Sequence, residues 1–198
     1  ARIISVVFHP LLIPTYLIAV LINMRAFFAL MIPDEAKWKI VLLVLLTSAI
    51  FPMIALYGMF RLKLISSLMV EKRQERLYPY LAATLFFFLS FYMIRQINIS
   101  PVYYYSLLGA ALLALVTLII NVFWKVSAHT VSIGGVVGIL TGLHLVLHID
   151  MSWLIFATVF LGGIVGYARL RAGTHTDAQV YAGYLIGFLG TYLLIMYY

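Results

Sequence analysis

Two short polar segments, each set between long apolar ones, hold the residues best suited to chemistry. Residues 168–179 contain two arginines and a histidine, and residues 125–130 contain a lysine, a serine and a histidine. Ionisable groups are costly at membrane depth, so a cluster of them there indicates a function. A guanidinium can hold two phosphate oxygens at once, and an imidazole titrates near neutral pH. These residue types predict a site that handles phosphate.

Phosphoryl transfer without a metal ion has three chemical requirements. It needs fixed cations, a nucleophile in line with the leaving group, and an acid that protonates the leaving oxygen. Two imidazoles are available for the last two roles, namely His129 and His175. The cations that could neutralise the phosphate oxygens are Lys72, Arg73, Arg76, Lys125, Arg169 and Arg171. Taken singly, the arginines at span ends also fit interfacial anchors.

The composition excludes a soluble domain. Of the 198 residues, 65% are hydrophobic and 10% are charged, and the mean hydropathy is +1.11. A soluble domain carries roughly a quarter charged residues. Because a helical span needs ~20 apolar residues, we expect an all-α transmembrane bundle of roughly six or seven spans, forming one domain over residues 1–198. The absence of cysteine excludes disulfides, thiol catalysis and thiolate metal sites.

Apolar runs and turn signals place these spans to within several residues. The predicted spans are 3–31, 38–60, 78–97, 101–124, 130–148, 151–168 and 179–198. Pro10 and Pro14 interrupt the first one, which we expect to be kinked or to begin as a re-entrant segment. The tight turns at 98–101 and 148–150 imply antiparallel neighbours.

The number of spans between two loops decides whether those loops lie on the same membrane face. Two spans separate the loop at 61–79 from the loop at 125–130, and two more separate that loop from 168–179. All three loops therefore lie on the same membrane face and can converge on one site.

Small residues recur at helical spacing in the last three spans. The stripes are Gly134, Gly138 and Gly142, then Gly162 and Gly166, then Gly183 and Gly187. Such stripes allow helix backbones to approach closely in lipid. We expect a tight C-terminal unit of three helices that holds the second and third polar loops rigidly.

The spacing of the polar residues resembles a known family. Arg169, five intervening residues and His175 are similar to the third motif of the phosphatidic acid phosphatase type 2 superfamily, which is Ser-Arg, five residues, His, three residues, Asp. Residues 127–129, Ser-Ala-His, resemble its second motif, Pro-Ser-Gly-His, just before a helix. The first motif, Lys, six residues, Arg-Pro, is matched only loosely by residues 71–79. The resemblance extends to about residue 187.

The resemblance implies a phosphatase that forms a phosphohistidine and uses neither metal nor cofactor. In this interpretation His175 is the nucleophile and His129 protonates the leaving alkoxide. Gln179 stands where the family has the aspartate that orients the nucleophile. It can accept a hydrogen bond but carries no charge, and a comparable loss in another His-carboxylate pair costs orders of magnitude in rate. The phosphate-binding residues would be Arg169, Ser127, Lys72, Arg76 and Lys125.

These observations favour a phosphatase or phosphotransferase for a lipid or polyprenyl phosphate that enters from the bilayer. The alternative is a weak or inactive relative that binds anionic lipid or serves as a membrane subunit of a larger complex. A carrier for ions or small solutes is disfavoured, because the charges lie at span ends rather than at the midplane. No nucleic-acid partner is expected, since there is no basic soluble module, and self-association stays open.

The net charge of +7 bears on topology. Basic residues gather on cytoplasmic loops, and more of them lie on the face with the motifs, which favours a cytoplasmic site. Without the candidate phosphate ligands the two faces are nearly balanced. The family resemblance favours the outer face of a bacterial inner membrane, as a multi-pass protein.

The remaining three histidines lie outside these motifs. His144 and His148 share one helix face near Asp150, a spacing that can bind a metal. Parity places them at the face opposite the motifs, so we expect them to form interhelical hydrogen bonds instead. His9 and Pro10 begin the first span on the motif side and are expected to line the pocket.

Overall fold

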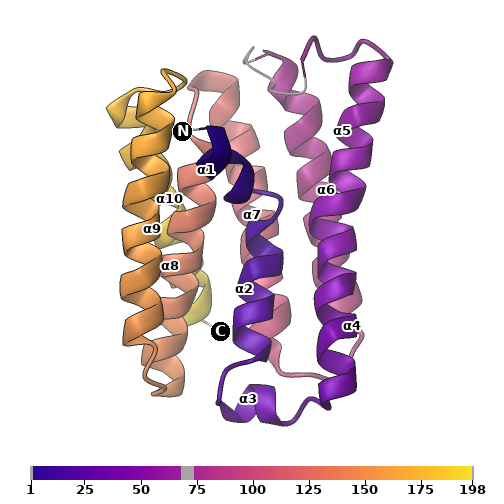
Figure 1. Ribbon diagram of the computed structural model, residues 1–198, viewed down its shortest axis with the longest axis vertical. Helices are drawn as coiled ribbons and strands as arrows, with labels where there is room; N and C mark the ends of the chain where they lie inside the picture. Colours follow the sequence, from indigo (N-terminus) through magenta and orange to yellow (C-terminus); the bar gives the residue numbers. More distant parts are fainter. Residues whose placement is uncertain (1, 68–73, 198) are drawn as a thin grey trace.

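The computed structural model describes residues 2–67 and 74–197, and every regular element within these ranges is a helix (Figure 1). Six helices are long and apolar enough to cross a membrane: Asp34–Arg61, Gln74–Arg95, Pro101–Phe123, Ala128–Leu147, Ser152–Arg171 and Asp177–Met196. The predicted all-α transmembrane bundle is therefore confirmed, with no separate soluble domain among the described residues.

The first long crossing is built from three consecutive elements: α4 (Asp34–Leu45), the π-helix η1 (Leu46–Ile50) and α5 (Phe51–Arg61). A short 3₁₀ turn, η2 (Gln74–Arg76), leads into α6 (Leu77–Arg95). The remaining crossings are α7 (Pro101–Phe123), α8 (Ala128–Leu147), α9 (Ser152–Arg171) and α10 (Asp177–Met196). Their ends differ from the predicted spans by only a few residues.

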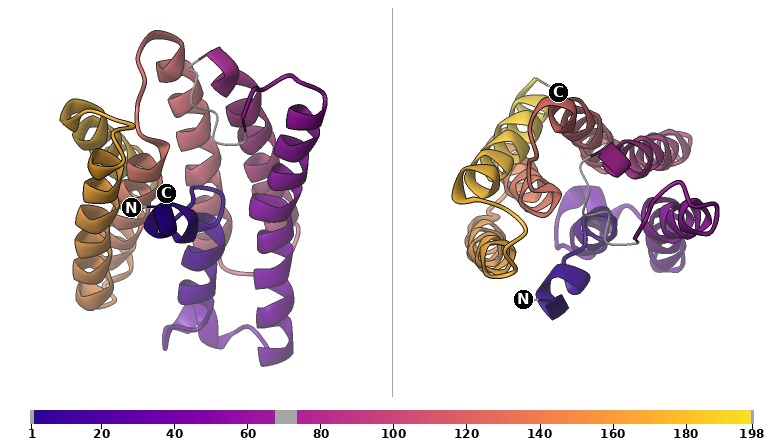
Figure 2. Two further views of the ribbon diagram at one scale, coloured as in Figure 1. Left: turned by 45° about the horizontal axis from the view of Figure 1, so that its top comes forward. Right: turned by 90° about the horizontal axis from the view of Figure 1, so that it is seen from above.

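The predicted span at 3–31 is broken into three short helices. These are α1 (Arg2–Val7), α2 (Ile13–Ile22) and α3 (Phe27–Leu30). Pro10 and Pro14 explain the break before α2, because proline cannot donate a backbone hydrogen bond and fits only the first turn of a helix. The ten residues of α2 span ~15 Å, about half the thickness of a bilayer core. Seen from above, the longer helices surround α2 on several sides (Figure 2), while Tyr16 and Val20 keep one of its faces exposed.

The polar loops are shorter than predicted. The segment 168–179 is a loop only at 172–176, because α9 continues to Arg171 and α10 begins at Asp177. Gly173 ends α9 in the left-handed conformation, with φ +64°. Likewise, α8 begins at Ala128 rather than 130, and α6 begins inside the predicted loop 61–79. For α10, a capping box formed by Thr176 and Gln179, described below, extends the helix into the polar segment.

Glycines allow α8 and α10 to pack backbone to backbone. A Cβ atom on Gly134 would clash with the Tyr184 carbonyl, and one on Gly187 would clash with the Val131 carbonyl. Helix α9 packs less closely, because Gly162 accommodates the Tyr184 ring rather than a backbone atom. The close approach predicted from the glycine stripes is therefore confirmed for α8 and α10, whereas α9 joins them through side chains.

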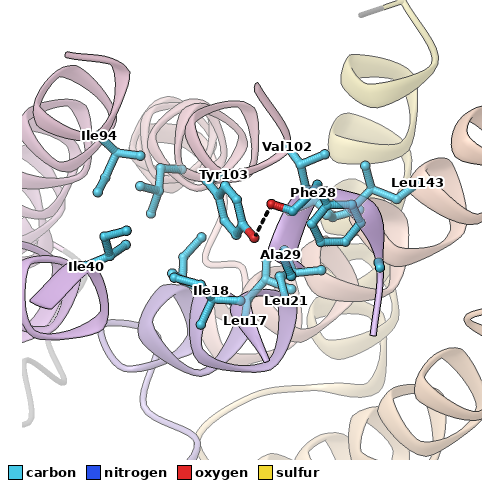
Figure 3. Close-up of a cluster of buried hydrophobic side chains, with 14 of the residues drawn as sticks. Leu17, Ile18, Leu21, Phe28, Ala29, Ile40, Ile94, Val102, Tyr103 and Leu143 are labelled. Atoms are coloured by element: carbon cyan, nitrogen blue, oxygen red, sulfur yellow. Dashed lines mark hydrogen bonds between the residues drawn. The ribbon is translucent and has the colours of Figure 1, made fainter. Parts of the chain in front are cut away.

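A buried apolar cluster anchors α2 and α3 at the end of the bundle away from the polar loops. Leu21, Phe28, Ile40, Tyr103 and Leu143 bring five helices together there (Figure 3). The Tyr103 hydroxyl donates a hydrogen bond to the Phe28 carbonyl oxygen at 3.3 Å. Because this cluster holds the short helices, the residues before α2 are left at the polar end.

Buried hydroxyl pairs attach the π-helix to its neighbours. The hydroxyls of Thr15, on α2, and Ser48 lie 3.0 Å apart. On α6, Ser90 donates to the Thr47 hydroxyl at 2.6 Å. Such hydrogen bonds between helices join α2, η1 and α6 within the apolar interior.

Replacing Gly187 with alanine tests the packing of α8 on α10. The added methyl group has no space beside the Val131 carbonyl and the Gly135 nitrogen, so Gly187→Ala should destabilise the fold by about 1–3 kcal/mol or more. Thermal unfolding in detergent measures this effect.

The matched control for this substitution is Gly163→Ala. A Cβ at Gly163 meets no atom within 4 Å, and alanine is the better helix former. The control should unfold at the temperature of the parent protein or slightly above it. Equal unfolding temperatures for the two variants would contradict the packing.

Candidate functional site

A cavity of about 220 Å³ lies between the helices and reaches the end that carries the polar loops. The arginine and histidine side chains in its lining come from five short segments of the chain: His9, Arg76, His129, Arg169 and His175. These residues come from the chain before α2, from η2, from the first turn of α8, from the last turn of α9, and from the turn before α10. The predicted convergence of the three polar loops is confirmed for these residues, and so is the expected place of His9.

A capping box orients His175. The Thr176 backbone N–H donates to Oε1 of Gln179 at 3.3 Å, which makes that atom an acceptor. Nδ1 of His175 lies 3.1 Å from the same oxygen and must therefore donate to it. The neutral ring then has its lone pair on Nε2. Asp177 is exposed on the first turn of α10 and does not take the place of the orienting carboxylate.

The surroundings of His175 keep its ring neutral. Its side chain is 9% exposed, and burial, followed by the charge of Arg169, lowers its pKa to about 4. The hydrogen bond from Nδ1 to Gln179 opposes this shift only partly. Because the uncharged form predominates at neutral pH, Nε2 is available as a nucleophile without prior loss of a proton.

Ser5 of α1 occupies hydrogen-bonding positions on the two groups expected to act on phosphate. Nε2 of His129 donates to the Ser5 carbonyl oxygen at 3.0 Å. Nη1 of Arg169 donates to the Ser5 hydroxyl at 3.0 Å. Nε of Arg169 is buried and has no hydrogen-bond partner among the described residues. The site thus presents donors to oxygen atoms and retains one unused donor.

His9 adds a third imidazole to the site. Its Nδ1 accepts the Leu11 backbone N–H at 3.3 Å, so the neutral ring carries its proton on Nε2. The ring meets that of His129 edge to face, with centroids 5.7 Å apart. Burial and the charge of Arg169 both lower the pKa of His9. His9 is therefore an uncharged hydrogen-bond donor beside His129.

Two predicted phosphate ligands, Ser127 and Lys125, are not among the residues that line this cavity. Ser127 is fully buried at the N-terminus of α8, and its hydroxyl has no hydrogen-bond partner within the described part of the chain. Its backbone N–H donates to the Gln179 carbonyl at 3.3 Å, which ties α8 to α10. Lys125 is half-buried, and its charge contributes to the lowered pKa of His175. Lys72 lies outside the described residues.

The structure also reveals contributors that the sequence pattern did not single out. Ser5 is a lone serine in an apolar segment, and no motif marks it. Tyr80 lines the cavity one turn after Arg76 and interacts with that arginine. The one signal for Tyr80 in the sequence is that it directly follows the charged segment 71–79.

His144 makes its hydrogen bonds at the connection between α8 and α9. Its Nδ1 lies 2.8 Å from the carbonyl oxygen of Ile149 and 3.4 Å from the backbone nitrogen of Met151, the residue that precedes α9. These contacts form because His148 adopts a left-handed conformation, with φ 54°, and reverses the chain there. No group of three or more potential metal ligands occurs among the described residues.

Comparisons of the chain with protein-family models, with curated proteins and with solved structures find no match. The lining residues of the cavity are therefore the main evidence on its chemistry. Within the described ranges they include two arginines and three histidines but no aspartate or glutamate. This excess of donors and positive charge at the polar end of the cavity is chemically suited to an anion.

Replacing Gln179 with glutamate tests how the neutral amide affects His175. A carboxylate 3 Å from Nδ1 favours the imidazolium, so Gln179→Glu should raise the pKa of His175 from about 4 to above about 5. NMR titration of protein labelled in histidine measures this pKa directly.

Gln96→Glu provides the matched control, because Gln96 is exposed beyond the far end of α6. This variant should leave the titration of His175 unchanged. An unaltered His175 pKa in Gln179→Glu would mean that the side chain of residue 179 does not contact the ring.

Proposed function

We propose that the protein is a membrane-embedded phosphatase or phosphotransferase that acts on a lipid phosphate through a phosphohistidine. The observation that carries this proposal is the position of His175, whose Nδ1 donates to Gln179 and leaves Nε2 as the acceptor nitrogen, in a cavity lined by Arg76 and Arg169 and, among the described residues, by no carboxylate. The motif resemblance to the phosphatidic acid phosphatase type 2 superfamily supports the same chemistry.

In the first step, Nε2 of His175 attacks the phosphorus atom. When the phosphate anion binds, the His129 ring takes up a second proton and becomes an imidazolium. The bond from phosphorus to the ester oxygen then breaks, and that oxygen takes the Nε2 proton of this imidazolium and leaves as an alcohol, with His129 neutral. Arg169 and Arg76 neutralise the charge that spreads over the other phosphate oxygens. His175 then carries the phosphoryl group on Nε2, while Gln179 accepts the hydrogen bond from its Nδ1.

In the second step, water attacks the phosphorus of the phosphohistidine. Its proton passes to Nε2 of His129, and the bond between phosphorus and His175 breaks. Inorganic phosphate leaves, and both histidines return to their starting state. An alcohol in place of water would give a new phosphate ester, which is the phosphotransferase outcome.

Ser5 has a defined place in this cycle. Its carbonyl and hydroxyl oxygens meet His129 and Arg169, which are the donors that phosphate oxygens require. Substrate phosphate would replace these contacts and also satisfy Nε of Arg169. Helix α1 must therefore withdraw from the two side chains when substrate binds.

A lipid substrate follows from where the site lies. The phosphate-binding residues are at the ends of membrane-spanning helices, and the cavity continues between those helices. A substrate carried by the bilayer reaches such a site without crossing a soluble domain. By the motif resemblance, the site would face the outer side of a bacterial inner membrane.

A second function is favoured by one observation, the neutral side chain at position 179. Without a carboxylate to stabilise the imidazolium, the site could retain a lipid phosphate without turning it over. In that case the protein binds anionic lipid or serves as a subunit of a membrane complex. Turnover of purified protein with a panel of lipid phosphates separates the two functions.

Replacing His175 with alanine tests the nucleophile. His175→Ala should lower phosphate release by at least ~10³-fold and should abolish the acid-labile phosphoenzyme that is trapped with ³²P-labelled substrate. His148→Asn, at the far end of α8, should retain both signals, since asparagine tolerates the positive φ there. Phosphoenzyme in His175→Ala would contradict the proposed mechanism.

Replacing His129 with alanine tests the acid. Loss of a positioned proton donor slows alkyl phosphate hydrolysis by ~10²–10⁴-fold. The loss should be much smaller for p-nitrophenyl phosphate, because its phenolate leaves without a proton. Steady-state rates with the two substrates measure this contrast. Equal losses for both would assign His129 to binding rather than to proton transfer.

A further inference from the structure

The cavity extends far beyond the polar residues. Along α8 its lining runs from Ala128 to Ile139, which is ~16 Å at 1.5 Å per residue. One leaflet of the hydrocarbon core is about 15 Å thick. The cavity therefore runs from the polar end to about the middle of the membrane, and it does so inside the bundle.

One face of α7 keeps this inner part open. Ser106, Ala110, Ala114 and Thr117 all line the cavity and recur at helical spacing. None of these side chains is large. On the opposite wall, Gly135 of α8 also leaves space. The width of the cavity thus depends on small residues at consecutive turns.

The hydroxyl groups that line the inner part of the cavity already have hydrogen-bond partners in the backbone. The hydroxyl of Ser106 donates to the Val102 carbonyl at 2.7 Å, and that of Ser132 donates to the His129 carbonyl at 3.0 Å. The Thr191 hydroxyl donates to the Gly135 carbonyl at 2.8 Å. Because these hydroxyls are satisfied by backbone, the surface they present suits hydrocarbon. Leu17, Phe87 and Ile139 complete it.

The volume limits how much hydrocarbon can enter. About 220 Å³ is less than the ~300–1,000 Å³ of pockets that enclose a drug-sized ligand. A cavity this long and this small suits one unbranched or prenyl chain better than two acyl chains side by side.

We propose that the substrate is a single-chain lipid phosphate whose hydrocarbon chain lies in this inner cavity while its phosphate meets Arg169 and His175. This inference rests on the proposed phosphatase function and narrows its substrate class. A diacyl phosphatidic acid shares the same phosphate chemistry but presents two chains.

The first test compares three substrates with the purified full-length protein. The ratio kcat/KM should be at least tenfold higher for dodecyl phosphate than for dioleoyl phosphatidic acid, and higher for dodecyl than for butyl phosphate. Equal values for the one-chain and two-chain lipids would overturn the single-chain assignment. If no substrate releases phosphate, the phosphatase proposal fails. The photolabelling experiment below then decides whether the cavity holds a hydrocarbon chain.

A substitution in the cavity gives the second test. Ala114→Phe places a ring in the inner part and should lower the preference for dodecyl over butyl phosphate by at least tenfold. Ala157→Phe, which makes the same change on the exposed face of α9, should keep the preference of the parent protein. An unchanged preference in Ala114→Phe would overturn the placement of the chain.

Photolabelling tests the placement without requiring turnover or a variant. A dodecyl phosphate with a diazirine near the chain end should label inner residues such as Ala110 and Ile139, as mapped by mass spectrometry. Competition with dodecyl phosphate should remove these labels. Labels confined to lipid-facing residues of α7, such as Leu112 and Val116, would overturn the inference.

Discussion

The backbone-to-backbone packing of α8 on α10 is the constraint on which the site depends. Because Gly134 and Gly187 carry no side chain, the two helices approach closely enough for the Ser127 N–H to reach the Gln179 carbonyl. That contact joins the first turns of both helices. His129 begins one of them and His175 immediately precedes the other, so the separation of the two imidazoles follows from glycine packing in the membrane interior.

Electrostatics then determines what this framework can bind. Arg76 and Arg169 line one cavity, and the described residues contribute no aspartate or glutamate to its lining. Burial together with Arg169 keeps His175 and His9 uncharged at neutral pH. An anion that enters this site satisfies donors that are otherwise unpaired, such as Nε of Arg169. The neutral amide of Gln179 fits this arrangement, because it orients His175 without offsetting the positive charge.

The split of the N-terminal segment is equally important for the site. Pro10 and Pro14 prevent a continuous helix, and the apolar cluster around Phe28 and Tyr103 holds α2 and α3 against the longer helices. The chain before α2 is consequently free to fold over the polar end, where Ser5 contacts His129 and Arg169. A continuous first span would have left the mouth of the cavity uncovered by this segment.

Much of the fold was predictable from local pattern. Apolar runs of about 20 residues determine the long helices, because lipid leaves a backbone no other way to satisfy its hydrogen bonds. Parity then placed Arg76, His129, Arg169 and His175 at one end, and glycine spacing indicated the close helix pair. The ends of the polar loops were not predictable to the residue, since capping by Thr176 and Gln179 extends α10 into one of them.

The sequence by itself therefore determined the class of fold, the membrane end that carries the site and the residue types available for chemistry. These properties follow from hydropathy, helix period and residue identity, all of which are local. Only the tertiary structure decided that Ser127 and Lys125 lie outside the cavity, that Ser5 contacts the site, and that a narrow apolar cavity runs beneath it. Those features depend on how helices distant in the chain pack, and side-chain packing in three dimensions is not encoded in spacing along one helix.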